Sequence, residues 1–472
     1  MFAKIQRIHF VGIGGIGMSG IAEVLLTLGY KVSGSDLKNS AITERLAKLG
    51  AIIFQGHSSD NIAGAEVVVT STAIPTDNPE VAAAHEQLIP VIRRAEMLAE
   101  LMRLKYGIAI AGMHGKTTTT SMVAAVLAGG GLDPTVVVGG RVDAMGSNAR
   151  LGKSQYLVAE ADESDRSFLK LSPILAVVTN IDREHMDCYR NLKDIKRAFL
   201  EFMDRVPFYG MVVLCNDDQP LRSLLPQLHR RTVTYGTRKD SDFRISLGAR
   251  GSCTSPEQPM SRFRVQYNGK ELGEFHLHVP GTHNVLNATA AIAVGVGLDI
   301  DIEQIRSALK QFRGVDRRFQ LRGSVAGVNV IDDYGHHPTE IRATLAAAKQ
   351  CGYRRIHVIF QPHRYTRTQA LMEQFATAFE DAANVFVLDI YAASEAPIEG
   401  VTAEVLAQRI HEATEQPVRH VPSFSDAIDA VVAMSEEGDM ILTLGAGNVS
   451  QLGPQIVEGL SARQRQEAAT GD

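Results

Sequence analysis

The chain has 472 residues and a formal net charge of −5 at pH 7; 45% of its residues are hydrophobic and 21% are charged. A chain of this length exceeds one ordinary core and predicts about three domains. The mixed composition is typical of a globular protein, which argues against a disordered chain and against nucleic acid as a partner.

The first predicted unit is a strand, a glycine-bearing turn and a helix. The strand RIHFV leads into GIGGIG, a helix follows, and a second strand, KVSGSD, stops at Asp36. Gly12, Gly14 and Gly17 satisfy GxGxxG, and Asp36 stands where a ribose-binding acid is expected, so taken alone the pattern predicts NAD. Such a turn binds a diphosphate, which a UDP-sugar also supplies. A tight turn that only packs the helix closely is the structural alternative.

A second glycine turn follows the apolar strand YGIAIA. Gly112, Gly115, Lys116 and Thr117 lie between this strand and a helix start, where backbone N–H groups and the positive helix end bind phosphate oxygens. We expect Lys116 at the β- and γ-phosphates of ATP and Thr117 as a ligand of Mg²⁺. Ile110 takes the place of the first glycine of GxxxxGK[ST], so an ordinary glycine turn is the competing interpretation.

Acidic residues follow the next two apolar strands. LVAEADESD places Glu160 and Asp162 at the end of one strand, and NIDREHMD places Asp182, His185 and Asp187 after the other. In an open parallel sheet the carboxyl ends of the strands line the ligand crevice. Magnesium prefers a few carboxylates with phosphate and water, so Glu160 and His185 are candidate metal ligands. Taken singly, such residues are usually solvated or structural.

Two further regions complete the chain. Polar and apolar residues alternate between Asp240 and Val279, and Asn268 with Gly269 predicts a hairpin turn, so we expect an antiparallel excursion there. Beyond GVDRRF, strands are predicted in VNVIDDYGHHP, RIHVIFQPHR, NVFVLDIY and MILTLGAG, between alanine-rich helices. The last residues predict a frayed helix or tail.

The repeated order of strand, glycine turn and helix predicts an α/β fold with mostly parallel sheets. Three domains are expected, with boundaries near Lys105 and Gly314. They are a Rossmann-like domain over residues 1–105, a central P-loop ATPase-like domain over 106–313, and a C-terminal Rossmann-like α/β domain over 314–472.

The cysteines and the lengths of the apolar segments indicate in which cellular compartment the protein resides. The four cysteines, at positions 188, 215, 253 and 351, show no CxxC pairing, which predicts neither a disulfide framework nor a zinc site and suits a reducing cytosol. The N-terminus enters a strand pattern at once, without a signal-length apolar segment, and no apolar run has membrane-spanning length. We therefore expect a cytoplasmic protein without membrane insertion.

Together the motifs resemble those of the bacterial Mur ligases. In chain order they are GIGGIGMSG, GMHGKTTTT, EADESD, TNIDREHMD, PGTHNVLNATAA, DDYGHHPTE and QPHRYTRT. The resemblance covers essentially the whole chain, and the family's three-domain plan agrees with the boundaries above. It implies the branch of the family that joins L-alanine to the lactyl carboxylate of UDP-N-acetylmuramate during peptidoglycan precursor synthesis, through an acyl phosphate made from ATP.

The resemblance also implies where each substrate binds. The N-terminal domain is expected to hold the UDP part of the substrate, in place of NAD, through Gly14, Gly15, Ile16, Gly17, Asp36, His57 and Ser71. The central domain is expected to hold ATP and magnesium through Gly112, Met113, His114, Gly115, Lys116, Thr117 and Thr118, with Glu160 and His185 on the metal. His283 and Asn287 are carried toward the adenine, although both also suit a simple helix start.

In the third domain the family pattern carries four residues toward the reaction centre, namely His336, His363, Arg364 and Arg367. Arg318 and Asp332 are carried toward the nucleotide or domain closure. The motifs do not decide which of three histidines is the general base: His185, His336 or His363. The expected state is a monomer or a weak homodimer.

One position departs from the sister ligases. Several of them carry a modified lysine where this chain has Phe199, which argues against those sisters and leaves open what supports a second metal ion. Three alternatives stay in view. They are a relative that attaches a whole peptide, a dinucleotide-dependent oxidoreductase, which leaves the second glycine turn unexplained, and a nucleotide-sensing module without catalysis.

Overall fold

The computed structural model describes residues 5–71, 73–142, 147–186, 188–248, 253 and 259–470. The chain forms two compact units, each described here by itself. The first unit comprises Met1–Ser246, Arg264–Gly273 and Leu286–Phe312, and the second comprises Leu247–Phe263, Glu274–Val285 and Arg313–Asp472. Asp187, one of the acidic residues noted above, lies outside the described residues.

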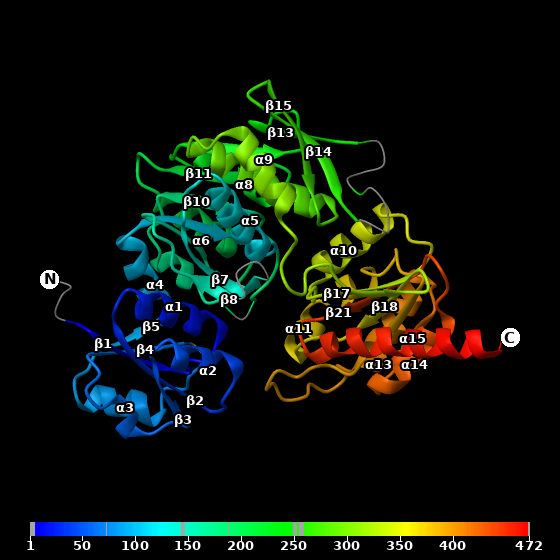
Figure 1. The fold of residues 1–472 in the computed structure, drawn as a ribbon, viewed down its shortest axis with the longest axis horizontal. Helices are drawn as coiled ribbons and strands as arrows, with labels where there is room; N and C mark the ends of the chain where they lie inside the picture. Colours follow the sequence, from blue (N-terminus) through cyan, green and yellow to red (C-terminus); the bar gives the residue numbers. More distant parts are fainter. Residues whose placement is uncertain are drawn as a thin grey trace. The chain divides into compact units, whose positions relative to one another are not determined.

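A five-stranded parallel sheet forms the N-terminal part of the first unit (Figure 1). Its strands are β1 (Arg7–Val11), β2 (Lys31–Asp36), β3 (Ile52–Gln55), β4 (Val67–Thr70) and β5 (Val91–Arg93), in the order β3-β2-β1-β4-β5. The helices are α1 (Ile16–Thr27), α2 (Ala41–Lys48), α3 (Pro79–Glu86) and α4 (Arg94–Arg103). The strand order reverses between β1 and β4, which makes the carboxyl ends of these strands a topological switch point.

A ten-stranded sheet follows, in the order β15-β14-β13-β12-β11-β10-β6-β9-β7-β8. The strands are β6 (Tyr106–Ala111), β7 (Thr135–Val142), β8 (Ser147–Arg150), β9 (Tyr156–Glu160), β10 (Leu175–Val178), β11 (Met211–Cys215), β12 (Thr232–Gly236), β13 (Phe243–Leu247), β14 (Ser261–Tyr267) and β15 (Lys270–Leu277). The helices are α5 (Lys116–Gly129), α6 (Leu192–Asp204), α7 (Gln219–Arg222), α8 (Thr282–Gly297) and α9 (Ile302–Gln311). The central strands β6 and β10 are almost continuously apolar because both faces of a parallel sheet are covered.

The predicted excursion between Asp240 and Val279 is only partly confirmed. Asn268 and Gly269 have φ angles of 49° and 79° and form the turn between the neighbouring strands β14 and β15, as predicted. The start of the excursion was wrong, because β13 pairs in parallel with β12, with Phe243 opposite Tyr235. Alternation of polar and apolar residues reports that one face of a strand is exposed, but it does not report the direction of the neighbouring strand.

The second unit contains a six-stranded sheet in the order β16-β17-β21-β18-β19-β20. The strands are β16 (Gln320–Val325), β17 (Val328–Asp333), β18 (Ile356–Phe360), β19 (Asn384–Val387), β20 (Val418–His420) and β21 (Met440–Leu444), and β16 is antiparallel to β17. The helices are α10 (Pro338–Gln350), α11 (Tyr365–Ala370), α12 (Met372–Ala376), α13 (Ala403–Thr414), α14 (Phe424–Met434) and α15 (Leu452–Thr470).

Alternate residues of β21 fill two apolar cores, one on each face of this sheet. Leu442 packs with Phe360 and Ile341 on one face, whereas Ile441 packs with Val330 on the other. This division follows from the period of two along a strand. The last residues, predicted as a frayed helix or tail, belong to helix α15, which continues to Thr470.

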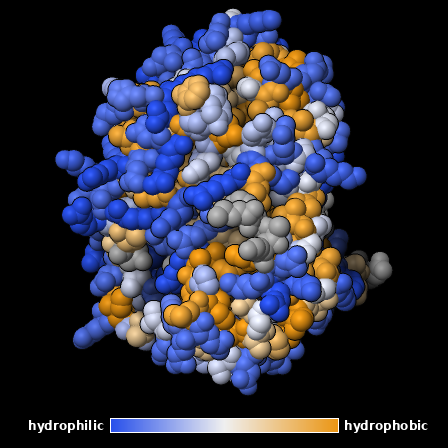
Figure 2. Space-filling view, turned by 90° about the vertical axis from the view of Figure 1, so that its left-hand side faces the viewer, coloured by the Kyte–Doolittle hydropathy of each residue, from blue (hydrophilic) through white to orange (hydrophobic). Residues whose placement is uncertain are grey.

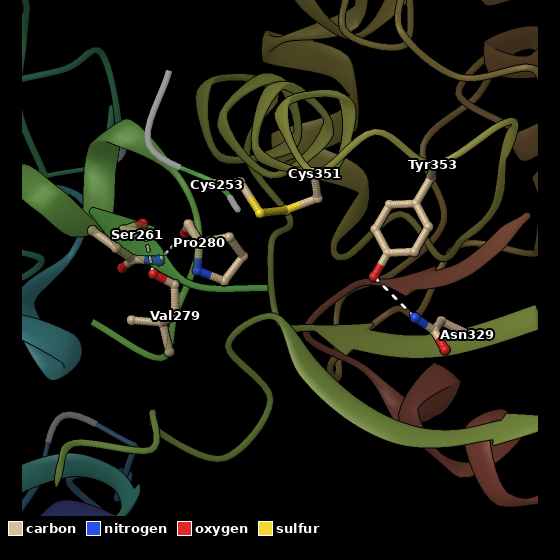
Figure 3. Close-up of a disulfide and its surroundings, with 8 residues drawn as sticks. Cys253, Ser261, Val279, Pro280, Asn329, Cys351 and Tyr353 are labelled. Atoms are coloured by element: carbon tan, nitrogen blue, oxygen red, sulfur yellow. Dashed lines mark hydrogen bonds between the residues drawn. A yellow bond between two sulfur atoms is a disulfide. The ribbon is translucent and has the colours of Figure 1, made fainter. Parts of the chain in front are cut away.

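The cysteine prediction was wrong for one pair. Cys253 and Cys351 form a disulfide between the connection after β13 and the residue that follows α10 (Figure 3). The two residues are 98 positions apart, so only the fold brings them together. Cys188 and Cys215 remain thiols.

We expect the denatured, non-reduced protein to titrate two thiols with Ellman's reagent, and four after reduction. Because the bond closes a long loop, reduction should lower the free energy of unfolding by up to about 4–5 kcal/mol, visible as a lower urea midpoint. In the Cys351→Ser variant the midpoint should no longer respond to reductant. Four titratable thiols before reduction would contradict the assignment.

The surface is mostly hydrophilic on the face shown in Figure 2, where small groups of apolar side chains lie between polar ones. Within the described ranges, no helix combines the length and the apolar character that crossing a bilayer requires.

Candidate active site

The loop between β6 and α5 has the backbone of a phosphate site. Gly112 and Gly115 have φ angles of 136° and 81°, a region that strains any side chain. A Cβ on Gly112 would lie 2.0 Å from Oγ1 of Thr179, and one on Gly115 would lie 2.8 Å from Oδ1 of Asn287. Gly115 caps α5, so the first N–H groups of the helix face the space before the loop. The shortened motif therefore keeps the glycines that this backbone needs.

Residues after β10 hold the loop in place. The backbone N–H of His114 donates to Oδ1 of Asn180 (2.8 Å), while Oγ1 of Thr179 and Nδ2 of Asn180 donate to the carbonyl oxygen of His114 (2.7 and 2.9 Å). Nε2 of His114 lies 3.0 Å from Oδ2 of Asp182. The side chains of Met113 and Thr118 are buried, so only their backbones can face a nucleotide.

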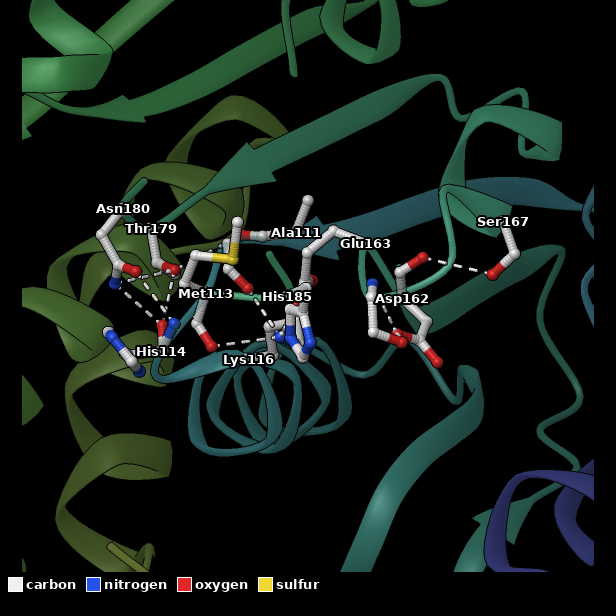
Figure 4. A network of polar contacts seen from close by, with 12 residues as sticks. Ala111, Met113, His114, Lys116, Asp162, Glu163, Ser167, Thr179, Asn180 and His185 are labelled. Carbon is white, nitrogen blue, oxygen red and sulfur yellow. Dashed lines mark hydrogen bonds and ion pairs between the residues drawn. The ribbon is translucent and has the colours of Figure 1, made fainter. Parts of the chain in front are cut away.

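Lys116 is paired with a carboxylate that sequence reasoning missed. Its Nζ donates to Oε1 of Glu163 (2.7 Å) and to the carbonyl oxygens of Gly112 (2.6 Å) and Met113 (3.2 Å), as Figure 4 shows. Burial lowers the pKa of Lys116, but the charge of Glu163 outweighs burial and the pKa is raised. The ammonium group is therefore fully charged at neutral pH and lies across the loop.

Glu163 also contacts the candidate metal ligand His185. Oε1 of Glu163 lies 3.5 Å from Nε2 of His185, and its side chain is 1% exposed. Its second oxygen, Oε2, is buried and has no hydrogen-bond partner among the described residues. Glu163 stands in the same EADESD motif as Glu160, and that motif was the signal that could have identified it.

The structure brings the predicted metal ligands to one sheet edge. Glu160 ends β9, opposite Ile110 of β6, Thr117 is the second residue of α5, and His185 follows β10 with a φ of 56°. A hydroxyl, a carboxylate and an imidazole beside a phosphate loop suit a divalent cation held between protein and phosphate oxygens. Asp162 instead accepts a hydrogen bond from Nη2 of Arg94 (2.8 Å). The ligand assignments stay predictions.

Phe199, the position expected to differ from related ligases, lies in a closed aromatic cluster. It is fully buried and its ring meets that of Phe168 edge-on, with centroids 5.2 Å apart. Phe168 also stacks on Phe202, at 5.0 Å. A phenyl ring offers no ligand atom, so the side chain at this position contributes packing only.

The first glycine turn also follows a strand. Gly12 and Ile13 donate their N–H groups to the carbonyl oxygen of Ser35 (2.8 and 2.9 Å), and the N–H of Gly14 donates to Oδ2 of Asp36 (2.9 Å). A Cβ on Gly14 would lie 2.8 Å from the same oxygen. Asp36 therefore holds the turn with one carboxylate oxygen, and its contact with the substrate nucleotide stays a prediction.

The other predicted contacts to the UDP group come from neighbouring strand ends. His57 follows β3 and Ser71 follows β4, so both stand at the carboxyl edge that carries the glycine turn. Gly15 and Gly17 flank the start of α1, where a Cβ on Gly17 would lie 2.8 Å from Nη1 of Arg94. Ile16 is the first residue of α1. The structure thus groups these positions, and their roles stay predictions.

A second group of predicted residues gathers in the second unit. The rings of His336 and His363 lie 5.9 Å apart, and Nη1 of Arg367 lies 3.2 Å from Nδ1 of His363. His363 also stacks on Tyr391, with centroids 5.5 Å apart. Arg364 has a φ of 73° and reaches toward Glu395 (3.9 Å). These residues follow β17 and β18, at the carboxyl edge of this sheet.

The surroundings of His363 disfavour its charged form. Burial, then the neighbouring His336, Arg367 and Arg364, lower the pKa of His363 to about 4. Its imidazole is therefore neutral at pH 7 and can accept a proton. His283, on α8, has its pKa lowered to about 4 by burial and by Arg318.

We expect the stability of the protein to fall as the pH drops from about 6.5 to about 4. In that window an unfolded histidine is protonated while His363 in the fold is not, so the unfolded state binds more protons. Between these two pH values, the free energy of unfolding of the His363→Gln variant should fall by roughly 1–2 kcal/mol less than that of the wild type. This figure allows for the partial exposure of His363. Urea titrations at pH 7 and at about pH 4.5 would measure this, and parallel curves would contradict it.

Asp332 and Arg318 occupy different settings. Asp332 is fully buried and is committed to three partners, Arg317 (3.2 Å), Arg322 (3.1 Å) and the hydroxyl of Thr443 (2.7 Å). Such a carboxylate supports its own sheet, and nothing in the structure supports its predicted nucleotide role. Arg318 lies over the ring of Tyr334 at 5.1 Å and 3.7 Å from Glu340.

Comparison with known proteins decides the family. The Mur ligase family, catalytic domain, matches residues 7–106, the Mur ligase middle domain matches residues 110–295, and the Mur ligase glutamate ligase domain matches residues 317–447. The chain belongs to the Mur ligase family. Its α/β fold with mostly parallel sheets is that of this family.

Relatives within the Mur ligase family are similar over the full length. The UDP-N-acetylmuramate–L-alanine ligase of Koribacter versatilis is 71% identical, over 98% of this chain and 99% of that protein. The ligase of the same name from Acidobacterium capsulatum is 63% identical, over 98% of this chain and 99% of that protein. The crystal structure of UDP-N-acetylmuramate-alanine ligase MurC from Thermotoga maritima matches with a TM-score of 0.80 at 32% identity, over 97% of this chain and 99% of that chain.

Proposed function

We propose that this Mur ligase joins L-alanine to the lactyl carboxylate of UDP-N-acetylmuramate and releases ADP and phosphate. The observation that carries the proposal is the phosphate loop with Lys116 paired to a buried carboxylate, in a chain 71% identical to a ligase of that name. We assign the reaction to the cytoplasm, as a step of peptidoglycan precursor synthesis, with the protein acting as a monomer or weak homodimer.

The chemistry requires an activated acid. A carboxylate is a poor electrophile, so its phosphorylation by ATP supplies a leaving group, and the amine of alanine then displaces phosphate. The backbone N–H groups of Gly115 and Lys116 and the ammonium of Lys116 bind and orient the phosphates. Asn287, expected to approach the adenine, lies beside Gly115 of this loop.

Magnesium fits the donors at this sheet edge. Thr117, Glu160 and His185 would hold it, and when bound it neutralises negative charge on the phosphates. Glu163, with one oxygen on Lys116 and the other without a hydrogen-bond partner among the described residues, positions the ammonium and the imidazole of His185.

The second unit supplies groups suited to the amine and to the transferred phosphoryl. Arg364 and Arg367 carry fixed positive charge that can bind carboxylate or phosphate oxygens in pairs. His363 is neutral at pH 7 and is a candidate acceptor of the proton from the attacking amine, although a pKa of about 4 makes it a weak base. His336, which packs against it, and His185 are the other candidates for that proton.

The decisive experiment is ADP release with UDP-N-acetylmuramate and a panel of amino acids and peptides. The proposal expects release only when ATP, the nucleotide sugar and L-alanine are all present. Preference for a tripeptide over L-alanine would instead identify the peptide-attaching relative. Absence of release with every acceptor would indicate a nucleotide-sensing module, and tight binding of NAD would revive the oxidoreductase.

A further inference from the structure

A buried carboxylate beside the N-terminal sheet was not anticipated from the sequence and is not used by the mechanism above. Glu80 lies in the first turn of α3 and its side chain is 0% exposed. Its Oε2 accepts a hydrogen bond from Oγ of Ser35 (2.6 Å), and its Oε1 accepts one from Nδ2 of Asn61 (2.6 Å). A buried charge is costly unless it is paired, so these donors define its setting.

The network reaches the surface at one imidazole. Nδ1 of His57 lies 2.9 Å from Oγ of Ser35 and 3.3 Å from Oε2 of Glu80. The side chain of His57 is 15% exposed to solvent, whereas those of Glu80 and His9 are fully buried. Nε2 of His57 has no hydrogen-bond partner among the described residues.

Proton counting assigns the tautomer of His57. Although burial raises the pKa of Glu80, the neighbouring His9, with Nε2 at 3.6 Å, and hydrogen bonds from Ser35 and Asn61 hold it at about 2, so Glu80 is a carboxylate and only accepts. Ser35 has one hydroxyl proton, which it must give to Oε2 at 2.6 Å. Its remaining contact with His57 is then as an acceptor, so Nδ1 of His57 carries a proton. In the neutral ring Nε2 is left as an acceptor.

We propose that Glu80, acting through Ser35, sets the tautomer of His57 so that Nε2 accepts a hydrogen bond from the uridine of the substrate, either from the imide N3–H of uracil or from a ribose hydroxyl. Glu80 is thus a positioning residue for nucleotide specificity. The inference rests on the proposed function, because it takes the N-terminal glycine turn as the site of the UDP group. It explains why a charge is buried directly behind the strand ends that carry Asp36 and His57.

The Glu80→Gln variant tests the relay because the amide can enter in only one orientation. Oε1 receives both Nδ2 of Asn61 and the backbone N–H of Ser58 (3.4 Å), and Asn61 is itself oriented by donating to the carbonyl oxygen of Gly56 (3.2 Å). The backbone N–H of Ser58 and the amide of Asn61 cannot become acceptors there, whereas the hydroxyl of Ser35 and a neutral His9, whose Nε2 lies 3.6 Å from Oε2, can. The glutamine oxygen therefore stands at Oε1, which puts its NH₂ group at Oε2. Ser35 then accepts there and donates to His57, so the imidazole proton moves to Nε2.

Nitrogen-15 NMR of the imidazoles at about pH 8.5, where ordinary imidazoles are neutral, reads the tautomer directly. The wild type should show His57 protonated on Nδ1, with an Nε2 resonance that shifts when UDP is added. Glu80→Gln should show the proton on Nε2. Ser35→Ala should keep it on Nδ1, since Oε2 of Glu80 lies 3.3 Å away. A wild-type ring protonated on Nε2, or on both nitrogens, would overturn the proposal even if Glu80→Gln failed to fold.

Kinetics test the recognition. Glu80→Gln should raise KM for UDP-N-acetylmuramate about tenfold or more, because two donors would then face each other, while kcat and KM for ATP stay unchanged. Competition by UDP, CDP and 2′-deoxy-UDP separates the two donors. Wild-type preference for UDP over CDP that vanishes in the variant indicates the uracil imide, and a preference for UDP over 2′-deoxy-UDP that vanishes indicates a ribose hydroxyl.

Glu66→Gln is the matched control, because Glu66 is a carboxylate of the same sheet that accepts from the backbone N–H groups of Gln6 and Arg7 (both 2.8 Å) away from His57. It should leave KM unchanged. A reversed tautomer with an unchanged KM would remove the recognition role. Failure of the wild type to ligate would instead refute the proposed function, which the NMR result does not depend on.

Discussion

Replacement of Lys116 by alanine should reduce kcat for ADP release by about 10³-fold, the largest single-residue effect that we expect. Lys116 is the one side chain of the loop that brings full positive charge to the phosphates, and its Nζ already lies at the carbonyl oxygens of Gly112 and Met113. Binding of UDP-N-acetylmuramate, measured by calorimetry, should stay within about twofold, because the UDP group is assigned to a separate sheet.

The control for this variant is Lys170→Ala. Lys170 is largely exposed and pairs loosely with Glu96 at 3.5 Å. Its loss should therefore leave both kcat for ADP release and the binding of UDP-N-acetylmuramate unchanged. If Lys116→Ala weakened the binding of the nucleotide sugar as much as it slowed ADP release, the division of labour between the two sheets would be wrong.

The Glu163→Gln variant should show the second-largest effect on activity and stability. Without the carboxylate, the ammonium of Lys116 and the imidazole of His185 lose their shared partner, and a buried charge left without its partner costs about 3 kcal/mol or more. We expect the free energy of unfolding at pH 7 to fall by about that amount, visible as a lower urea midpoint. Because Lys116 would no longer be held, kcat/KM for ATP should also fall, by about 10²-fold.

The control is Glu201→Gln, the same substitution on an exposed face of α6, where Glu201 pairs with Arg205 at 3.1 Å. It should change neither the free energy of unfolding nor kcat/KM for ATP. A Glu163→Gln protein with full stability but reduced kcat/KM would show that Glu163 acts on the phosphates alone. Full stability with full activity would show that Lys116 needs no partner at all.

Several features of the fold were predictable because their causes are local. The strand at Lys31–Asp36, the start of α5 after Gly115 and the turn at Asn268 and Gly269 follow from apolar runs and from glycine or asparagine at positive φ. The same holds for the phosphate loop, whose glycines and lysine are neighbours in the chain. Parallel pairing of β13 was missed, because alternation does not encode the direction of a neighbour.

The amino-acid order by itself determined the α/β class, the two glycine turns and the set of polar residues placed after strand ends. It determined these because each depends on contacts within about one turn of helix or one strand. Only the tertiary structure decided which of those residues meet. It placed Glu163 on Lys116, Glu80 behind His57, Asp332 among arginines and Cys253 on Cys351. Such pairs join segments from different strands, so they depend on strand order and register, which no short stretch of sequence contains.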